Sequence, residues 1–268
     1  MNHIWLNDRL TTPEAAAIDC SDRGFLLGDG VFETMRLHDG AITRLDAHLG
    51  RLAEGAKLLQ IPLPGEDRLR VALSILVEAN RIASGSLRLT LSRGAGPRGL
   101  LPPSSPRTTL LITQALPSPP LGPCRLHVSR YRRDGASPLS RIKHLNYLPQ
   151  ILSRLEADQA GYDDALLLSV DGVHVAEASA STLIVLSDGK LVTPSLQDGA
   201  LAGTARATLI EAGLCNETRL TLDALRHADT AWLVNSLSVR EVSALELDQY
   251  QIQTSWTERL IDCIFKAS

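Results

Sequence analysis

The chain has 268 residues, of which 44% are hydrophobic and 21% charged, and its net charge is −3, the profile of a globular protein long enough for two domains. So small a charge gives no reason to expect a nucleic-acid surface, and no apolar run reaches the roughly 20 residues that span a bilayer, so we expect no membrane partner. The N-terminus lacks a signal-peptide pattern and the scattered cysteines form no CxxC pair, so we expect a cytoplasmic protein without disulfides or a bound metal.

The first part of the chain predicts strands and helices in alternation. Residues 31–37 and 41–45 are typical of two strands, and the Asp39-Gly40 pair between them is a strong hairpin pattern. Apolar residues then recur at helical spacing, which predicts helices over about 45–59 and 66–82. Two further strands are expected at 86–92 and 108–113, joined by a loop rich in Gly and Pro.

The Pro-dense stretch 116–123 is typical of a connection between domains. We therefore expect a small N-terminal α/β domain over 1–115, a linker over 116–123 and a second domain over 124–268. The second domain predicts a helix over 145–160, a helix that begins near Gly203, and a late buried strand. Two hairpins with Asp-Gly turns are expected over residues 165–176 and 182–193, and the buried strand is expected over residues 230–234.

Two residues of the second domain suit a pyridoxal cofactor. Lys143 comes just before a predicted helix, and lysine is the side chain that forms Schiff bases. Glu177 follows a hairpin among small residues, where a carboxylate could keep a pyridine nitrogen protonated. Taken alone, Lys143 also fits a surface lysine that caps a helix, and Glu177 also fits an edge-strand glutamate that is exposed to water.

A phosphate site is the third element of this hypothesis. Small residues from Gly199 to Arg206 open a helix, and backbone N–H groups at a helix N-terminus bind phosphate. The pair Asn235-Ser236 ends a buried strand and offers further donors, and Arg51 on the first helix is either solvated or a phosphate ligand. Tyr147 is either a core aromatic or a partner of the cofactor hydroxyl, and His48 is typical of a half-buried structural histidine.

These pieces occur together in the order and at the separations of one family. The chain resembles the class IV aminotransferases, which are pyridoxal-phosphate enzymes of fold type IV. The resemblance rests on five motifs: Asp22 to Thr34, His48 to Leu52, Lys143 with Asn146-Tyr147-Leu148, Glu177, and Gly199 to Arg206. It implies two mixed α/β domains with the cofactor, pyridoxal 5′-phosphate, at their interface, and a homodimer.

The resemblance also implies a role for each residue of the site. Lys143 is the Schiff-base lysine, Glu177 pairs the pyridine nitrogen, and Tyr147 lies beside the ring hydroxyl. The phosphate and its surroundings are assigned to Arg51, Leu201, Gly203, Thr204, Ala205, Asn235 and Ser236. The chain departs from the family at Thr182, where relatives usually carry Asn, and this puts the local hydrogen-bond network in doubt.

Three activities share this scaffold: branched-chain L-amino-acid transamination, D-amino-acid transamination, and lysis of 4-amino-4-deoxychorismate to 4-aminobenzoate and pyruvate. Residues 142–146 and the loop 92–99 resemble those of the lyases, which serve folate biosynthesis. Arg98 in that loop is expected to bind a substrate carboxylate, and the histidine that D-amino-acid transaminases carry two residues later is Leu100 here. We therefore expect a lyase first and an aminotransferase second. A non-catalytic ligand-binding protein is the remote alternative.

Overall fold

The computed structural model describes residues 2–266, which divide into two compact units. The first unit comprises the chain up to Pro119 together with Ile142–Asn146, and the second comprises Pro120–Arg141 together with the chain from Tyr147 onward. The segment that contains Lys143 thus counts with the first unit, whereas the sequence pattern grouped it with the second domain. Among the described residues, no helix is both long enough and apolar enough to cross a membrane.

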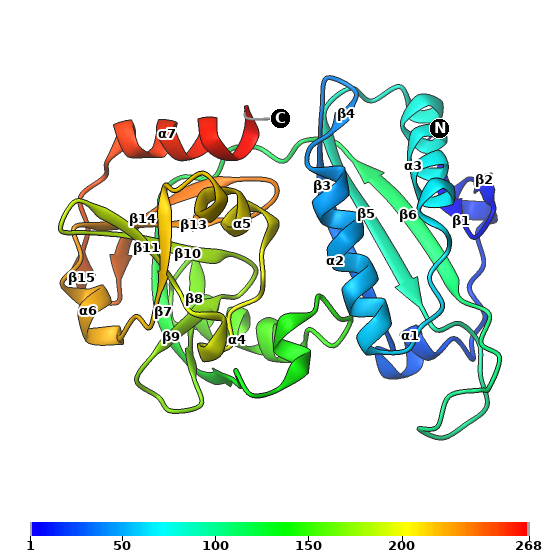
Figure 1. The fold of residues 1–268 in the computed structure, drawn as a ribbon, viewed down its shortest axis with the longest axis horizontal. Coiled ribbons are helices and arrows are strands. Elements are labelled where there is room, and N and C mark those ends of the chain that lie inside the picture. The colour runs from blue at the N-terminus through cyan, green and yellow to red at the C-terminus, as the bar shows by residue number, and fades with distance from the viewer. Residues whose placement is uncertain (1, 267–268) are drawn as a thin grey trace. The chain divides into compact units, whose positions relative to one another are not determined.

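The first unit, within the described residues, is a six-stranded antiparallel sheet in the order β2-β1-β6-β5-β3-β4, packed against two long helices (Figure 1). Its elements are β1 (Ile4–Leu6), β2 (Arg9–Thr11), α1 (Arg23–Leu27), β3 (Gly30–His38), β4 (Ala41–Ile42), α2 (Leu45–Leu58), α3 (Glu66–Asn80), β5 (Gly85–Ser92) and β6 (Thr109–Ala115). The predicted hairpin, both helices and both later strands of this part are confirmed. Asp39 and Gly40 have φ of 48° and 78°, as a tight hairpin turn requires.

One face of this sheet forms the core of the first unit. Alternate residues of β5, namely Leu87, Leu89 and Leu91, are fully buried against the apolar stripes of α2 and α3. On β3 the same alternation places Val31, Glu33 and Met35 on the helix side and Phe32 on the opposite face. A buried glutamate on the helix side is unusual and needs partners.

The second unit contains, within its described residues, a nine-stranded mixed sheet in the order β12-β11-β10-β13-β14-β7-β8-β9, with β15 paired to β14 (Figure 1). Its strands are β7 (Cys124–Arg133), β8 (Asp164–Ser169), β9 (Val175–Ala178), β10 (Thr182–Ser187), β11 (Lys190–Pro194), β12 (Cys215–Thr218), β13 (Thr230–Val234), β14 (Val239–Leu245) and β15 (Asp248–Gln249). Its helices are α4 (Leu148–Gln159), α5 (Thr204–Glu211), α6 (Leu222–Arg226) and α7 (Thr254–Phe265).

Both predicted hairpins of the second unit, the strand at 230–234 and the helix after Gly203 are confirmed. The helix predicted to start at residue 145 begins instead at Leu148, with Pro149 in its first turn. The helix does not start at Leu145 because the N–H of that residue donates to the Gly30 carbonyl, next to the bridge between Val31 and His144.

Candidate functional site

The backbone around Lys143 completes one edge of the first sheet. The Phe32 N–H donates to the Lys143 carbonyl at 2.9 Å, and the Leu145 N–H donates to the Gly30 carbonyl at 3.0 Å. Because β4 covers the other end of the same edge of β3, this segment fills the part that β4 leaves open. Ile142 anchors it in the core and is only 7% exposed. Lys143 therefore sits in a segment that is hydrogen-bonded to β3 on both sides of its neighbour His144.

The Lys143 side chain lies over an aromatic ring on the face of the sheet opposite to α2. Its Nζ is 4.4 Å from the centroid of the Phe32 ring. The guanidinium carbon of Arg88, on neighbouring β5, is 3.8 Å from the same centroid. The amine and the guanidinium thus share one aromatic platform. Sequence analysis missed Arg88, although its place between the buried Leu87 and Leu89 marked it as facing away from the core.

Arg51 is held by a buried carboxylate on the helix side of the sheet. Its Nε and Nη2 donate to Glu33 Oε1 and Oε2 at 2.8 and 2.6 Å, and His48 Nδ1 lies 2.7 Å from Oε2. The side chains of Glu33 and His48 are 1% and 0% exposed. This bidentate pair fixes the orientation of Arg51; its predicted contact with a phosphate stays a prediction.

The protonation of this triad follows from its burial. Burial acts to raise the pKa of Glu33, but the hydrogen bonds from Arg51 and His48 and the charge of Arg51 outweigh it and hold that pKa below its ordinary 4.5. Burial lowers the pKa of His48 below 6.5, and the neighbouring Glu33 opposes this only in part. At neutral pH the triad is therefore an anion, a guanidinium and a neutral imidazole that donates from Nδ1.

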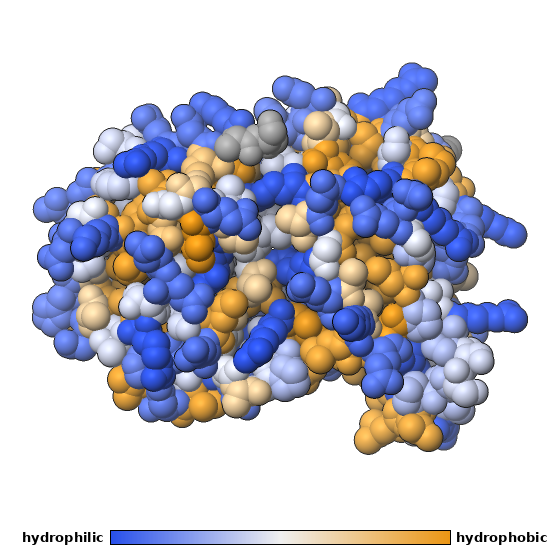
Figure 2. Space-filling model, viewed as in Figure 1, coloured by the Kyte–Doolittle hydropathy of each residue, from blue (hydrophilic) through white to orange (hydrophobic). Residues whose placement is uncertain are grey.

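Arg98 is exposed and lies in the loop between β5 and β6. Figure 2 shows hydrophobic surface gathered at the tip of this loop, where Leu100 and Leu101 are 83% and 85% exposed. Leu100 occupies the position at which a D-amino-acid transaminase is expected to carry histidine. This loop carries Arg93, which is buried, and two exposed arginines, Arg98 and Arg107, of which Arg98 adjoins the apolar tip.

In the second unit, Glu177 lies on β9, is 8% exposed and has a partner at each oxygen. Arg133 Nε is 3.0 Å from Oε1, and the Leu201 N–H donates to Oε2 at 2.9 Å. Arg133 also donates to the carbonyl of Gly199 at 3.0 Å, so one guanidinium ties Glu177 to the segment that leads into α5. Leu201 thus meets Glu177, a link that the sequence alone did not reveal.

The predicted phosphate site is the N-terminus of α5. Gly203 is its N-cap and provides no side-chain cap, and Thr204 and Ala205 in its first turn are 6% and 2% exposed. A Cβ on Gly203 would stand 3.0 Å from Thr182 Oγ1. Thr182, the residue that departs from the family pattern, therefore lies directly against this helix start.

Asn235 holds its own turn after β13. Its amide donates to Ser181 Oγ at 3.0 Å, and its carbonyl oxygen accepts from the backbone of Leu237 and Ser238 at 2.8 and 3.0 Å. This turn carries Ser236. Tyr147 is the N-cap residue of α4 and is partly exposed. The cofactor contacts expected of Asn235, Ser236 and Tyr147 stay predictions.

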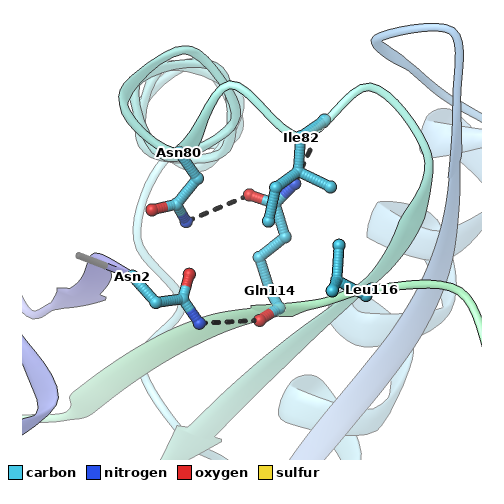
Figure 3. A pocket seen from close by; sticks show the side chains of 5 residues that line it. All are labelled: Asn2, Asn80, Ile82, Gln114 and Leu116. Atoms are coloured by element: carbon cyan, nitrogen blue, oxygen red, sulfur yellow. Dashed lines mark hydrogen bonds between the residues drawn. The ribbon is translucent and has the colours of Figure 1, made fainter.

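Two other clusters look structural. A pocket of about 320 Å³ in the first unit is lined by amides and apolar side chains (Figure 3), and Asn80 and Gln114 within it are hydrogen-bonded to each other at 3.1 Å. It offers no titratable group. In the second unit the side chains of Asp171, His174 and Asp198 lie close enough together to hold a metal ion, but Arg219 Nη2 lies 2.7 to 3.4 Å from all three. A cation of the chain itself already balances them.

The residues present suit pyridoxal phosphate. The cofactor requires an amine for its aldehyde, a carboxylate for its pyridine nitrogen and N–H donors for its phosphate. The first unit provides the amine on a segment that is hydrogen-bonded to β3. The second provides a buried carboxylate whose negative charge Arg133 balances, and a helix start without a side-chain cap.

Comparison with known proteins identifies the family of this chain. The family model described as "Amino-transferase class IV" matches residues 30–245. A protein of Methanocaldococcus jannaschii with a provisional name as a branched-chain-amino-acid aminotransferase is 33% identical, over 91% of this chain and 88% of its own. D-alanine aminotransferase of Listeria innocua is 30% identical, over 93% of this chain and 89% of its own.

Among solved structures, the 4-amino-4-deoxychorismate lyase of Pseudomonas aeruginosa is 30% identical and matches with a TM-score of 0.81, over 97% of this chain and 98% of its own. The resemblance expected from the motifs and the type IV fold are thereby confirmed. The chain therefore belongs to the class IV aminotransferase family, enzymes whose cofactor is pyridoxal 5′-phosphate.

Proposed function

We propose that this enzyme is a 4-amino-4-deoxychorismate lyase that forms 4-aminobenzoate and pyruvate. The observation that carries the proposal is the platform on β3, where Lys143 Nζ and the Arg88 guanidinium flank the Phe32 ring. With Arg98 of the same unit, the proposal assigns two cations to the substrate. Aminodeoxychorismate carries two carboxylates, whereas a branched-chain amino acid carries one and an aliphatic side chain. The similarity to the Pseudomonas lyase supports the same assignment.

In this proposal the bound cofactor supplies an electron sink for the charge that develops at the carbon bearing the substrate amine. Lys143 would hold the cofactor through its Nζ before substrate binds, and the same Nζ would then take the proton from that carbon. Glu177 keeps a proton on the pyridine nitrogen. The proton on Lys143 Nζ is the one that the departing enolpyruvyl group needs to become pyruvate, so the reaction balances without another reactant.

The phosphate is assigned to Arg51 and to the N–H groups of Thr204 and Ala205, with Gly203, Leu201, Asn235 and Ser236 around it. This arrangement lets the dipole of α5 and one guanidinium share the anionic charge. Tyr147 is assigned to the ring hydroxyl.

The second candidate function is an aminotransferase. The 33% identity to the Methanocaldococcus protein favours a branched-chain substrate, whereas Leu100 in place of histidine disfavours a D-amino acid. A transaminase would share the first proton transfer to Lys143 but would release a keto acid.

One experiment separates these functions. Purified enzyme is supplied with aminodeoxychorismate and the appearance of 4-aminobenzoate is followed by its fluorescence, while parallel reactions with L- and D-amino acids are assayed for keto acids. Formation of 4-aminobenzoate supports the lyase function. If the enzyme forms keto acid from a branched-chain amino acid and no 4-aminobenzoate, the transaminase function replaces the lyase function. Arg98→Ala should then depress kcat/KM by one to two orders of magnitude, about 1.4–2.8 kcal/mol, without bleaching the cofactor. A protein inert in every assay would raise the non-catalytic binding alternative.

We also propose that the enzyme is a cytoplasmic homodimer that serves folate biosynthesis. On α4, Leu148, Ile151, Leu152 and Leu155 are 42–67% exposed and fall at helical spacing on one face. An exposed apolar stripe of this kind is typical of an interface. Ile151→Glu should convert a dimer to a monomer in light scattering, whereas Ala160→Glu, at the exposed end of the same helix and off this face, should not. An unchanged dimer in the first variant contradicts the use of this face.

A further inference from the structure

The loop that carries Arg98, residues 93–108, is fastened at both ends by one buried carboxylate. Asp22 Oδ2 accepts hydrogen bonds from Ser92 Oγ at 2.9 Å and from Thr109 Oγ1 at 2.7 Å, the residues that border the loop. Its Oδ1 accepts from the Gly24 backbone at 2.8 Å, and Asp22 is only 2% exposed. A single side chain thus joins the start and the end of the loop to α1.

Arg23 holds the middle of the same loop through hydrogen bonds. Its Nη1 donates to the Gly99 carbonyl at 2.9 Å and its Nη2 to the Leu100 carbonyl at 2.7 Å, the carbonyls of the two residues that directly follow Arg98. Its Nε donates to Asp29 Oδ2 at 2.8 Å. Because a guanidinium is planar and rigid, these bonds fix two successive peptide groups at once.

Asp29 connects Arg23 to the rest of the first unit. Arg93 donates to both of its oxygens, from Nε at 2.7 Å and Nη2 at 3.0 Å. The same guanidinium donates to the carbonyls of Leu59 and Gln60, at 2.6 and 2.9 Å, where α2 ends. The loop, α1 and the end of α2 therefore share one buried charge cluster.

We propose that Asp22, Arg23 and Asp29 are positioning residues that hold Arg98 in the orientation in which it meets a substrate carboxylate. This inference rests on the proposed role of Arg98. Gly99 has a φ of 113°, so the chain turns sharply just after Arg98, and Arg23 binds both peptide groups that follow the turn. An exposed arginine on an unfastened loop must be ordered by the substrate itself, which weakens binding; a fastened loop has already been ordered.

The test uses two readouts on the holoenzyme. Trypsin cleaves after Arg98, so the rate of cleavage at this bond, mapped by mass spectrometry, reports how often the loop opens. The variants are Arg23→Met and Arg23→Lys; the lysine keeps a positive charge beside Asp29 but lacks the fork that binds two carbonyls. Arg68→Met, which removes an exposed arginine of the same unit, is the matched control.

Both Arg23 variants should be cut after Arg98 at least tenfold faster than the parent, with the cofactor absorbance unchanged, and kcat/KM should fall about tenfold, mainly through KM. The control should change neither. In an Arg98→Ala background, Arg23→Lys should have no further effect on kcat/KM, because the two residues act through one contact.

Three outcomes overturn the inference. Unchanged cleavage after Arg98 in both Arg23 variants means that Arg23 does not hold the loop. Faster cleavage with unchanged kcat/KM, while Arg98→Ala is impaired, means that Arg23 is not needed to position Arg98, and the proposed function stands. If the Arg23 variants are cleaved faster and kcat/KM is unchanged both in them and in Arg98→Ala, then Arg98 does not bind substrate. Its proposed role then fails together with the inference.

Discussion

The buried triad beneath the first sheet yields the most quantitative prediction. Glu33→Gln keeps the size of the side chain but removes its charge, which leaves Arg51, 10% exposed, without the anion that balances it. Breaking a buried ion pair by removing one partner costs about 3–5 kcal/mol. At a slope of about 2 kcal/mol per M of urea, the unfolding midpoint should fall by about 1.5–2.5 M.

The matched control is Glu66→Gln, which makes the same chemical change on the surface of α3. Glu66 pairs with Arg70 at i,i+4 and is 63% exposed, so its loss should cost about 0–1 kcal/mol. Urea unfolding followed by circular dichroism gives the midpoints, and hydrogen exchange of α2 peptides shows whether the loss occurs in the first unit. A Glu33→Gln midpoint no lower than that of Glu66→Gln would refute the reasoning, because Arg51 would then be stable without its partner.

Four further predictions follow from the site. His48 is held below its ordinary pKa of 6.5, so the stability it contributes is complete above pH 6.5 and is lost as the pH falls below it; His48→Asn should flatten this part of the urea-midpoint profile, and an unaltered slope would contradict the burial argument. Borohydride should fix the cofactor to Lys143, and a mass-spectrometric adduct on another lysine would end this assignment. Glu177→Gln should keep the cofactor bound but lose most turnover; near-normal rates would remove its role at the pyridine nitrogen. Arg51→Ala should weaken cofactor affinity roughly ten- to a hundred-fold, measured by equilibrium titration, and unchanged affinity would leave Arg51 with its structural role alone.

Local patterns predicted the elements whose cause is local. The Asp39-Gly40 and Asp188-Gly189 turns have both central residues at positive φ, which is why the sequence alone revealed their hairpins. The helical spacing of α2 and α3 likewise depends only on residues three and four apart.

Long-range pairing was beyond these patterns. The predicted helix start at residue 145 was wrong because Leu145 donates to Gly30, more than a hundred residues earlier in the chain. Strand β7 was not predicted, since it mixes charged and apolar residues, and its two neighbours β8 and β14 are both parallel to it. Two parallel strands cannot be joined by a tight turn, so no turn motif in the sequence indicates that they pair.

The motifs located candidate residues but not their partners. Glu33 and Asp29 lie within the motif that begins at Asp22, yet nothing in a linear pattern says that Arg51 or Arg93 faces them. The same is true of Arg133, which the structure places on Glu177. A buried charge is fixed by its counter-charge, and that counter-charge comes from a distant element.

The strand edge completed around Lys143 has a consequence for synthesis of the chain. As the polypeptide leaves the ribosome, residues up to 119 emerge first, and the open end of β3 then has its N–H and C=O groups bare. The segment that covers them arrives only after a further stretch, Pro120–Arg141, that belongs to the other unit. The nascent chain is thus exposed to edge-to-edge association until residue 146 has emerged. Pairing of this segment with β3 covers the exposed edge and at the same time places Lys143 beside Phe32.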